Sequence, residues 1–336
     1  MLVFSILLCY FELVYFHGHK YKMFKIAFHP IYVHPVPENH RFPMEKYELL
    51  PMQLVHEGIV EESNFFEPTQ EHIYDFSIHS ENYLERLFQC KLTKKEERAS
   101  GFKQNKLLVS REICITNGTV EASVHALKDG LSFNIAGGTH HAFSNRAEGF
   151  CLLNDQAIAS MHLLNNNLAS KILIIDLDVH QGNGTAEILS KESRVYTFSM
   201  HGEKNYPSEK PSSDLDIAIP DLTNDDQYLS LLKNKLKDIF KKVVPDFVFY
   251  QSGVDVLKSD KLGRISLSLK GCMQRDELVF GICKAYSVPV TTTMGGGYSK
   301  DIKIILKAHC NTFKAGISKY MESVSYTHLT LPTMLM

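Results

Sequence analysis

ILIIDLDVH, the stretch at residues 172–180, is an apolar run followed by two aspartates and a histidine at alternate positions. A short apolar run between helix-like segments is typical of a buried strand in a parallel sheet. Side chains alternate along a strand, so Asp176, Asp178 and His180 are predicted to share one face. Buried carboxylates are costly unless they are paired or bind a metal. The stretch therefore predicts a metal site at the end of a central strand.

The pattern along the rest of the chain is an alternation of strand-like and helix-like segments. This order predicts one three-layer α/β domain, with a mostly parallel central sheet and helices on both faces. The predicted strands are residues 24–28, 131–135, 171–179, 194–200, 246–251 and 288–294. The predicted helices are residues 41–56, 82–88, 118–128, 154–164, 226–241 and 269–286.

The expected domain covers residues 23–321. The segment 1–22 is largely apolar, but Glu12 interrupts it and it has no basic start, which argues against a membrane span or a signal peptide. We expect Met23 to be the working start and residues 1–22 to lie outside the fold. Met23 directly precedes the first strand-like run. The tail at 322–336 has no clear periodicity and stays unassigned.

Bulk composition excludes several classes of protein. The net charge is −2 over 336 residues and no long block of like charge occurs, so neither nucleic-acid nor membrane binding is expected. The seven cysteines are odd in number and show no CxxC spacing, which argues against a disulfide framework or a structural zinc site. Reduced thiols suit a cytoplasmic protein, or a nuclear one if the source is a eukaryote.

Polar or glycine residues follow five of the predicted strands. Ligands of open α/β sheets collect beyond the carboxyl ends of the strands, so these segments are predicted to form one site. They are His140-His141, Asp178 with His180, residues 199–201, Asp255, and residues 295–298.

Three of these side chains would leave one coordination position open. Asp178, His180 and Asp255 offer two carboxylates and an imidazole, and three protein ligands are the pattern of a catalytic metal site. The donors admit Zn²⁺, Fe²⁺ or Mn²⁺. The local alternative is a hydrogen-bonded Asp–His pair at a helix N-terminus.

The adjacent imidazoles of His140 and His141 favour a general base or acid, and Asp176 can fix the tautomer of one of them. The glycines at 295–297 let backbone approach a ligand closely. No Lys-Ser/Thr pair follows them, so a phosphate-binding P-loop is rejected. Tyr298 can aim its phenol at a developing oxyanion or can simply pack as an aromatic.

Together these segments resemble the histone deacetylase family, which has the arginase/deacetylase fold. The matching motifs are residues 137–142, 149–155, 176–184, 251–255 and 295–298, and the resemblance runs from about Phe24 to about Tyr320. The motif His-Gln-Gly-Asn-Gly at residues 180–184 most resembles the class IV branch and bacterial deacetylase-like proteins.

The resemblance implies a role for each site residue. Asp178, His180 and Asp255 would hold Zn²⁺, with Fe²⁺ as the alternative, and Tyr298 would polarise the substrate carbonyl. His140 and His141 would be the tandem histidines, oriented by Asp176 and Asn183. Gly149, Phe150 and Tyr206 would line a channel for the acyl-lysine stem, and K⁺ would bind near Asp176 and Ser199.

One position departs from the better-known branches of that family. Asn183 stands where many relatives carry an aspartate. An amide can still accept a hydrogen bond from Nδ1–H, but it brings no charge and would not raise the basicity of His141.

The implied activity is removal of acetyl or longer acyl groups from lysine in a peptide or protein, or from a small acylated amine. An acetylpolyamine amidohydrolase would share the chemistry and differ in channel access. A catalytically weak acyl-lysine reader is the non-enzymatic alternative. An arginase-like di-manganese enzyme would need a second carboxylate cluster, which Asn183 and the lone Asp255 do not supply. The sequence leaves substrate, acyl length and oligomeric state open.

Overall fold

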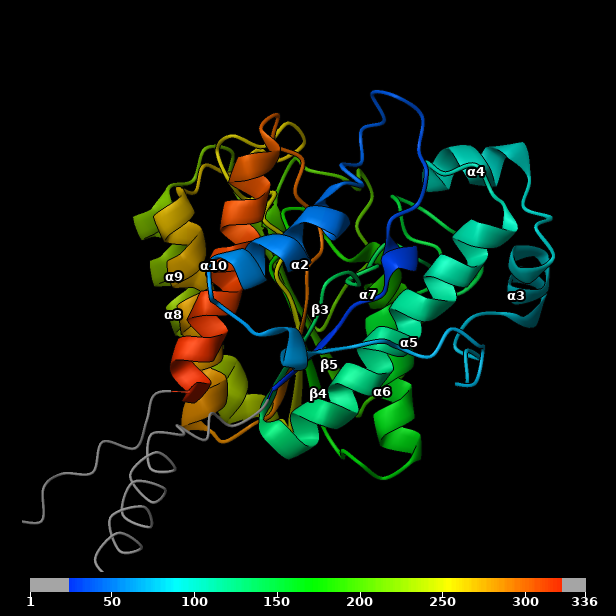
Figure 1. The fold of residues 1–336 in the computed structure, drawn as a ribbon. Helices are drawn as coiled ribbons and strands as arrows, with labels where there is room; N and C mark the ends of the chain where they lie inside the picture. Colours follow the sequence, from blue (N-terminus) through cyan, green and yellow to red (C-terminus); the bar gives the residue numbers. More distant parts are fainter. Residues whose placement is uncertain (1–23, 322–336) are drawn as a thin grey trace, which may run out of the picture. The chain divides into compact units, whose positions relative to one another are not determined.

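The computed structural model describes residues 24–321, and these fold around one open sheet (Figure 1). The predictions made for residues 1–22 and 322–336 lie outside the described residues. Within the described part, eight strands follow the order β2-β1-β3-β8-β7-β4-β5-β6, and every pairing is parallel. The strands are β1 (Lys25–Ala27), β2 (Phe65–Phe66), β3 (Leu131–Asn134), β4 (Ile172–Asp176), β5 (Val195–Gly202), β6 (Leu215–Ile219), β7 (Phe247–Gln251) and β8 (Val290–Thr293).

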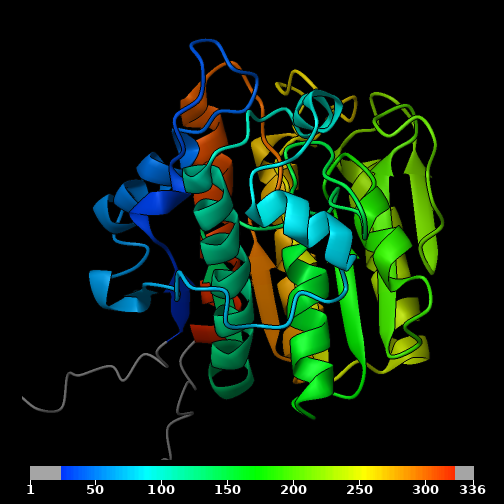
Figure 2. The ribbon, with the colours of Figure 1, turned by 90° about the vertical axis from the view of Figure 1, so that its right-hand side faces the viewer.

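Helices cover both faces of the sheet, which confirms the predicted three-layer α/β architecture. Helices α8, α9 and α10 lie on one side, and α5 and α6 lie on the other (Figures 1 and 2). None of the helices within residues 24–321 combines the length and apolar character needed to cross a membrane. The helices are α2 (Lys46–His56), α3 (Glu81–Phe88), α4 (Lys94–Ser100), α5 (Lys106–Asp129), α6 (Asp155–Asn165), α7 (Asn183–Leu189), α8 (Asp225–Val243), α9 (Leu269–Ala285) and α10 (Ile302–Met321).

The central strand is buried along its whole length, as its apolar run predicts. It lies between β5 and β7, so both of its edges carry ladder hydrogen bonds. The carboxyl end of β4 therefore lies beside the carboxyl ends of β5 and β7. The candidate site lies beyond these strand ends.

Several elements differ from the sequence prediction. Strand β4 ends at Asp176, so Asp178 and His180 lie in the turn beyond it rather than on one strand face. The edge strand β2 has two residues and β6 has an exposed face, so neither shows a continuous apolar run. Helix α4 has no apolar stripe, and its start is set by a capping box between Thr93 and Glu96. Helices α7 and α10 also went unpredicted.

Candidate active site

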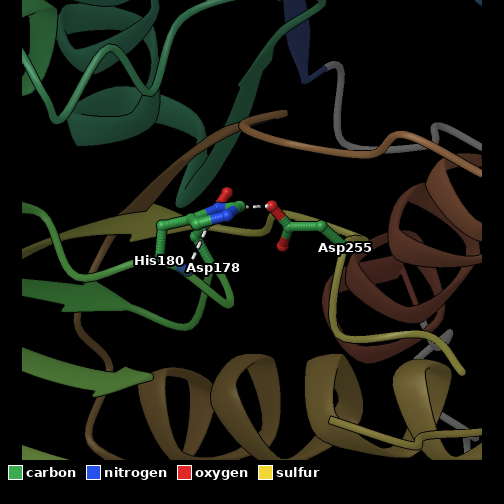
Figure 3. A group of neighbouring side chains, drawn as sticks. All are labelled: Asp178, His180 and Asp255. Carbon is green, nitrogen blue, oxygen red and sulfur yellow. Dashed lines mark hydrogen bonds and ion pairs between the residues drawn. The ribbon is translucent and has the colours of Figure 1, made fainter. Parts of the chain in front are cut away.

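Asp178, His180 and Asp255 converge at the carboxyl ends of β4 and β7 (Figure 3). All three side chains are buried. Nδ1 of His180 lies 3.1 Å from Oδ1 of Asp178 and 3.1 Å from Oδ2 of Asp255. A tetrahedral zinc ion with bonds of about 2.0–2.2 Å separates its ligand atoms by about 3.3–3.6 Å. The measured 3.1 Å separations are slightly shorter, so the three donors fit a divalent cation once they move apart by a few tenths of an ångström to admit it.

Backbone groups hold the remaining carboxylate oxygens in place. The Gly296 amide donates to Oδ2 of Asp178 at 2.8 Å, and the Val179 amide donates to Oδ1 of Asp255 at 2.9 Å. A Cβ on Gly253 would lie 2.1 Å from Oδ2 of Asp178, and one on Gly296 would lie 2.1 Å from Oδ2 of Asp255. Both positions therefore require glycine for the two carboxylates to keep this arrangement.

The charge of the group also points to a cation. Burial and the neighbouring Asp178 carboxylate raise the pKa of Asp255 above its usual range. Two buried carboxylates side by side repel each other unless a positive charge lies between them. A protonated His180 would supply only one positive charge, whereas a divalent ion supplies two and balances both carboxylates.

His140 is paired with a carboxylate. Its Nδ1 lies 2.7 Å from Oδ2 of Asp176, whose other oxygen accepts a hydrogen bond from the Asp178 amide. Burial opposes a charge on this ring, but the Asp176 and Asp178 carboxylates outweigh it and raise the pKa of His140 to about 9.

His141 is paired with an amide instead. Its Nδ1 lies 2.6 Å from Oδ1 of Asn183, and the Gly184 amide donates to the same oxygen at 3.0 Å. Since that oxygen is an acceptor, His141 donates through Nδ1 and keeps Nε2 as its free base. Burial, helped by the neighbouring His140 and His180 rings, holds the pKa of His141 well below its usual value. The Asn183 Nδ2 donates to Oε2 of Glu148 at 3.3 Å.

A pocket of about 490 Å³ opens onto these groups and contains His141, His180, Tyr298 and the predicted channel residues Gly149, Phe150 and Tyr206. The Tyr298 ring lies 6.0 Å from the Phe150 ring, measured between centroids. Tyr206 meets His141 edge to face at 5.0 Å and donates its hydroxyl to Glu148 at 2.5 Å. A Cβ on Gly149 would lie 2.5 Å from the His141 ring, so this wall also needs glycine.

The structure thus brings all the sequence-predicted site residues together. Asp176 and Asn183 lie behind the two histidines, away from the pocket lining. Ser199 is the register neighbour of Asp176 in the sheet, and its hydroxyl contacts Nδ1 of His201 at 2.9 Å. The K⁺ site near this pair stays a prediction.

Three positioning residues were missed by the sequence reasoning. Lys46 is buried and donates to the Gly295 carbonyl at 2.8 Å, and Oδ2 of Asp260 accepts from the Tyr298 amide at 2.6 Å. Arg275 is fully buried and donates to the Gly253 carbonyl at 2.6 Å. Lys46 and Arg275 lie in helices far from any motif, so no local signal marks them. Asp260 follows Asp255 by five positions, which was the one available hint.

Known proteins resemble this chain in sequence. The model of the histone deacetylase domain matches residues 40–313. The chain is 41% identical over 298 residues to an uncharacterized protein of Picosynechococcus sp., covering 88% of this chain and 99% of that protein. It is 31% identical over 272 residues to histone deacetylase 2 of Arabidopsis thaliana, covering 78% of this chain and 70% of that protein.

Two solved structures share the fold. A histone deacetylase homologue from Aquifex aeolicus superposes with a TM-score of 0.74 at 21% identity, covering 91% of this chain and 90% of that one. The HD domain of HDA15 superposes with a TM-score of 0.70 at 18% identity, covering 89% and 94%. With the matched domain spanning most of its length, this chain belongs to the histone deacetylase family.

Proposed function

We propose that this chain is a metal-dependent amidohydrolase that removes acetyl groups from lysine side chains. The observation that carries the proposal is the convergence of Asp178, His180 and Asp255 in a pocket that also contains His141 and Tyr298. Family membership supports the reaction class. We propose Zn²⁺ as the ion, with Fe²⁺ as the alternative, because one imidazole and two carboxylates accept either.

Each side chain around the ion has a separate role in the proposed amide hydrolysis. When bound, a divalent cation supplies a Lewis acid that polarises the amide carbonyl and makes water a better nucleophile at neutral pH. Nε2 of His141 takes a proton from the attacking water and passes it to the leaving amine, a role worth about 10²–10⁴-fold in rate. His140, held by Asp176, stabilises developing negative charge nearby.

Tyr298 completes the proposed mechanism. Burial raises the pKa of its phenol well above the usual value, so the hydroxyl keeps its proton at neutral pH. A protonated phenol can donate a hydrogen bond to the carbonyl oxygen as charge develops there. Loss of such a donor costs about 2.7–4 kcal/mol of transition-state stabilisation.

The size of the inner cavity favours a short acyl group. A second pocket, lined by His140, His141, Asp178, Tyr298 and the glycines at 137–138, has a volume of about 30 Å³. A cavity needs about 10–15 Å³ of such volume to hold one water molecule, so this one takes only a group the size of about two waters. We therefore propose acetyl as the preferred group, and longer chains would require the walls to move.

The proposed setting is a reducing compartment such as the cytoplasm or nucleus. The six cysteines within residues 24–321 are free thiols, and five of them are buried.

A panel of lysine peptides that differ only in acyl length tests the function. Protein loaded with Zn²⁺ or Fe²⁺ is expected to release acetate fastest, and Tyr298→Phe is expected to lose about 10²–10³-fold in kcat with its metal content unchanged. A metal-loaded protein that hydrolyses no acyl peptide would refute the proposal and favour an acyl-lysine reader. Faster turnover of acetylspermidine than of any peptide would favour the polyamine alternative.

A further inference from the structure

The mouth of the active-site pocket is lined by cations. Arg41, Arg98, Lys204, Lys261 and Arg264 share the pocket with His141 and Tyr298. Among the described residues that line this pocket, none is an aspartate or a glutamate. We call these five side chains the cationic collar. Its charge contrasts with a net charge of −2 for the whole chain, so the collar is a local concentration of positive charge.

Part of this charge is neutralised and part is free. Asp221 pairs with Arg264 at 2.8 Å and lies 3.8 Å from Lys204. Arg41, Arg98 and Lys261 are exposed, and within the described part of the chain their side chains have no ion-pair or hydrogen-bonding partner. Three free cations therefore face the solvent at the entrance to the site.

The positive surface continues beyond the mouth. A neighbouring groove of about 520 Å³ runs between residues 34–40 and α4, and it shares Arg98 and Gly101 with the active-site pocket. Its lining adds Lys94 and Lys103. The one acidic residue among its described lining, Glu97, is already paired with Lys94 at 2.8 Å. An extended chain leaving the pocket along this groove would stay in a positive environment.

We propose that the collar selects acyl-lysine substrates with acidic residues beside the modified lysine. This inference rests on the proposed function and deepens it by naming the substrate class. Charges of one sign lining a cleft attract ligands of the opposite sign and repel those of like sign. Polybasic tails and acetylated polyamines are therefore disfavoured at this entrance. An acidic peptide fits better than a compact anion because the positive lining extends from the pocket into the groove.

The expected selectivity follows from the exposed, free cations. An exposed ion pair changes an equilibrium constant by roughly 1.4- to 5-fold at moderate salt. Three such pairs together correspond to roughly 3- to 150-fold, and we expect about 10-fold tighter binding of an acidic peptide than of a neutral one. Because the pairs are exposed, the preference is expected to fall steeply between about 50 mM and about 500 mM salt.

Binding to the Tyr298→Phe variant measures this preference without depending on turnover. Acetyl-lysine peptides with flanking Asp/Glu, Ala/Ser or Lys/Arg are compared by fluorescence anisotropy, and kcat/KM of the metal-loaded wild type is measured on the same peptides. Charge reversal at Arg98 or Lys261 (R98E, K261E) is expected to lower the acidic preference. The matched control is K237E, an equal charge change at an exposed position on α8 outside both pockets.

The outcomes separate this inference from the proposed function. Equal affinity for acidic and neutral peptides, or an equal loss in K237E, would overturn the collar's role. Tighter binding of a single-stranded oligonucleotide than of the acidic peptide would also overturn it and assign the collar to nucleic acid. Hydrolysis of neutral peptides without any preference for acidic ones would support the proposed hydrolase function and refute the role of the collar. Preferential acidic binding without hydrolysis of any peptide would support the collar and refute the hydrolase.

Discussion

Replacing Asn183 by aspartate tests how this chain sets the proton affinity of His141. The substitution puts a negative charge where Oδ1 of Asn183 now accepts from Nδ1 of His141 at 2.6 Å. An opposite charge at such a distance raises a histidine pKa by about 1–3 units, or about 1.4–4 kcal/mol at 1.36 kcal/mol per unit. His141 acts as a base only when neutral. A higher pKa therefore moves the acidic limb of the kcat/KM profile to higher pH.

The environment of Asn183 limits the size of this effect. Its Nδ2 donates to Oε2 of Glu148 at 3.3 Å, and a carboxylate cannot make that bond. The two negative charges would repel each other and oppose full ionisation of the new side chain. We therefore expect a shift below the full range in the single variant. The double variant Asn183→Asp with Glu148→Gln restores a donor and is expected to show the full shift.

The assay is kcat/KM for an acetyl-lysine peptide as a function of pH, with metal content verified for each variant. Glu148→Gln alone serves as the background control. The acidic limb reports groups of the free enzyme, so substrate binding does not enter it. A limb that stays in place in both the single and the double variant would refute the assignment of His141 as the base that Asn183 tunes.

Three further changes give separate tests. Gly296→Ala places a Cβ 2.1 Å from Oδ2 of Asp255, so metal affinity is expected to fall at least 10-fold by metal titration, whereas unaltered affinity would contradict the proposed ligand set. Arg275→Met leaves the buried Asp276 carboxylate without a positive charge, with only the Tyr250 and Thr312 hydroxyls as partners. The variant is expected to cost about 3–5 kcal/mol in denaturant unfolding, and a loss below about 1 kcal/mol would argue against the pair's role. Chelation is expected to abolish turnover, with recovery on adding Zn²⁺ or Fe²⁺ but not Mg²⁺, and activity that survives chelation would exclude a metal mechanism.

The architecture could be predicted because strand and helix patterns alternate in a way that admits few topologies. Asp178 and Asp255 follow apolar runs in separate segments, and the rule that parallel strands end at one edge brings them close. Their actual contact depends on β4 and β7 being neighbours, which the order of segments along the chain does not specify. Strand alternation was the wrong reason for grouping Asp176 with Asp178, because the chain turns after residue 176.

The collar and the buried supports could not be predicted from local patterns. Nothing in the sequence distinguishes Arg41, Arg98 and Lys261 from other basic residues. Only the fold brings their segments together at the mouth of the active-site pocket. An arginine on a helix such as α9 is expected from sequence to be exposed to solvent. Arg275 is instead completely buried and donates to backbone carbonyls. Such residues are identified by their surroundings, and those surroundings come from distant parts of the chain.

Glu148 links two parts of the site that have different tasks. It accepts hydrogen bonds from the Tyr206 hydroxyl in the channel wall and from the Asn183 amide that holds His141. Without the Tyr206 hydroxyl, Glu148 would keep Arg146 and the Asn183 amide as its donors, and its Oε2 would depend on the amide alone. Hydrogen bonds in series polarise one another, so the Asn183 carbonyl becomes a stronger acceptor for His141. A change at the Tyr206 end of Glu148 therefore reaches His141 through a chain of three hydrogen bonds.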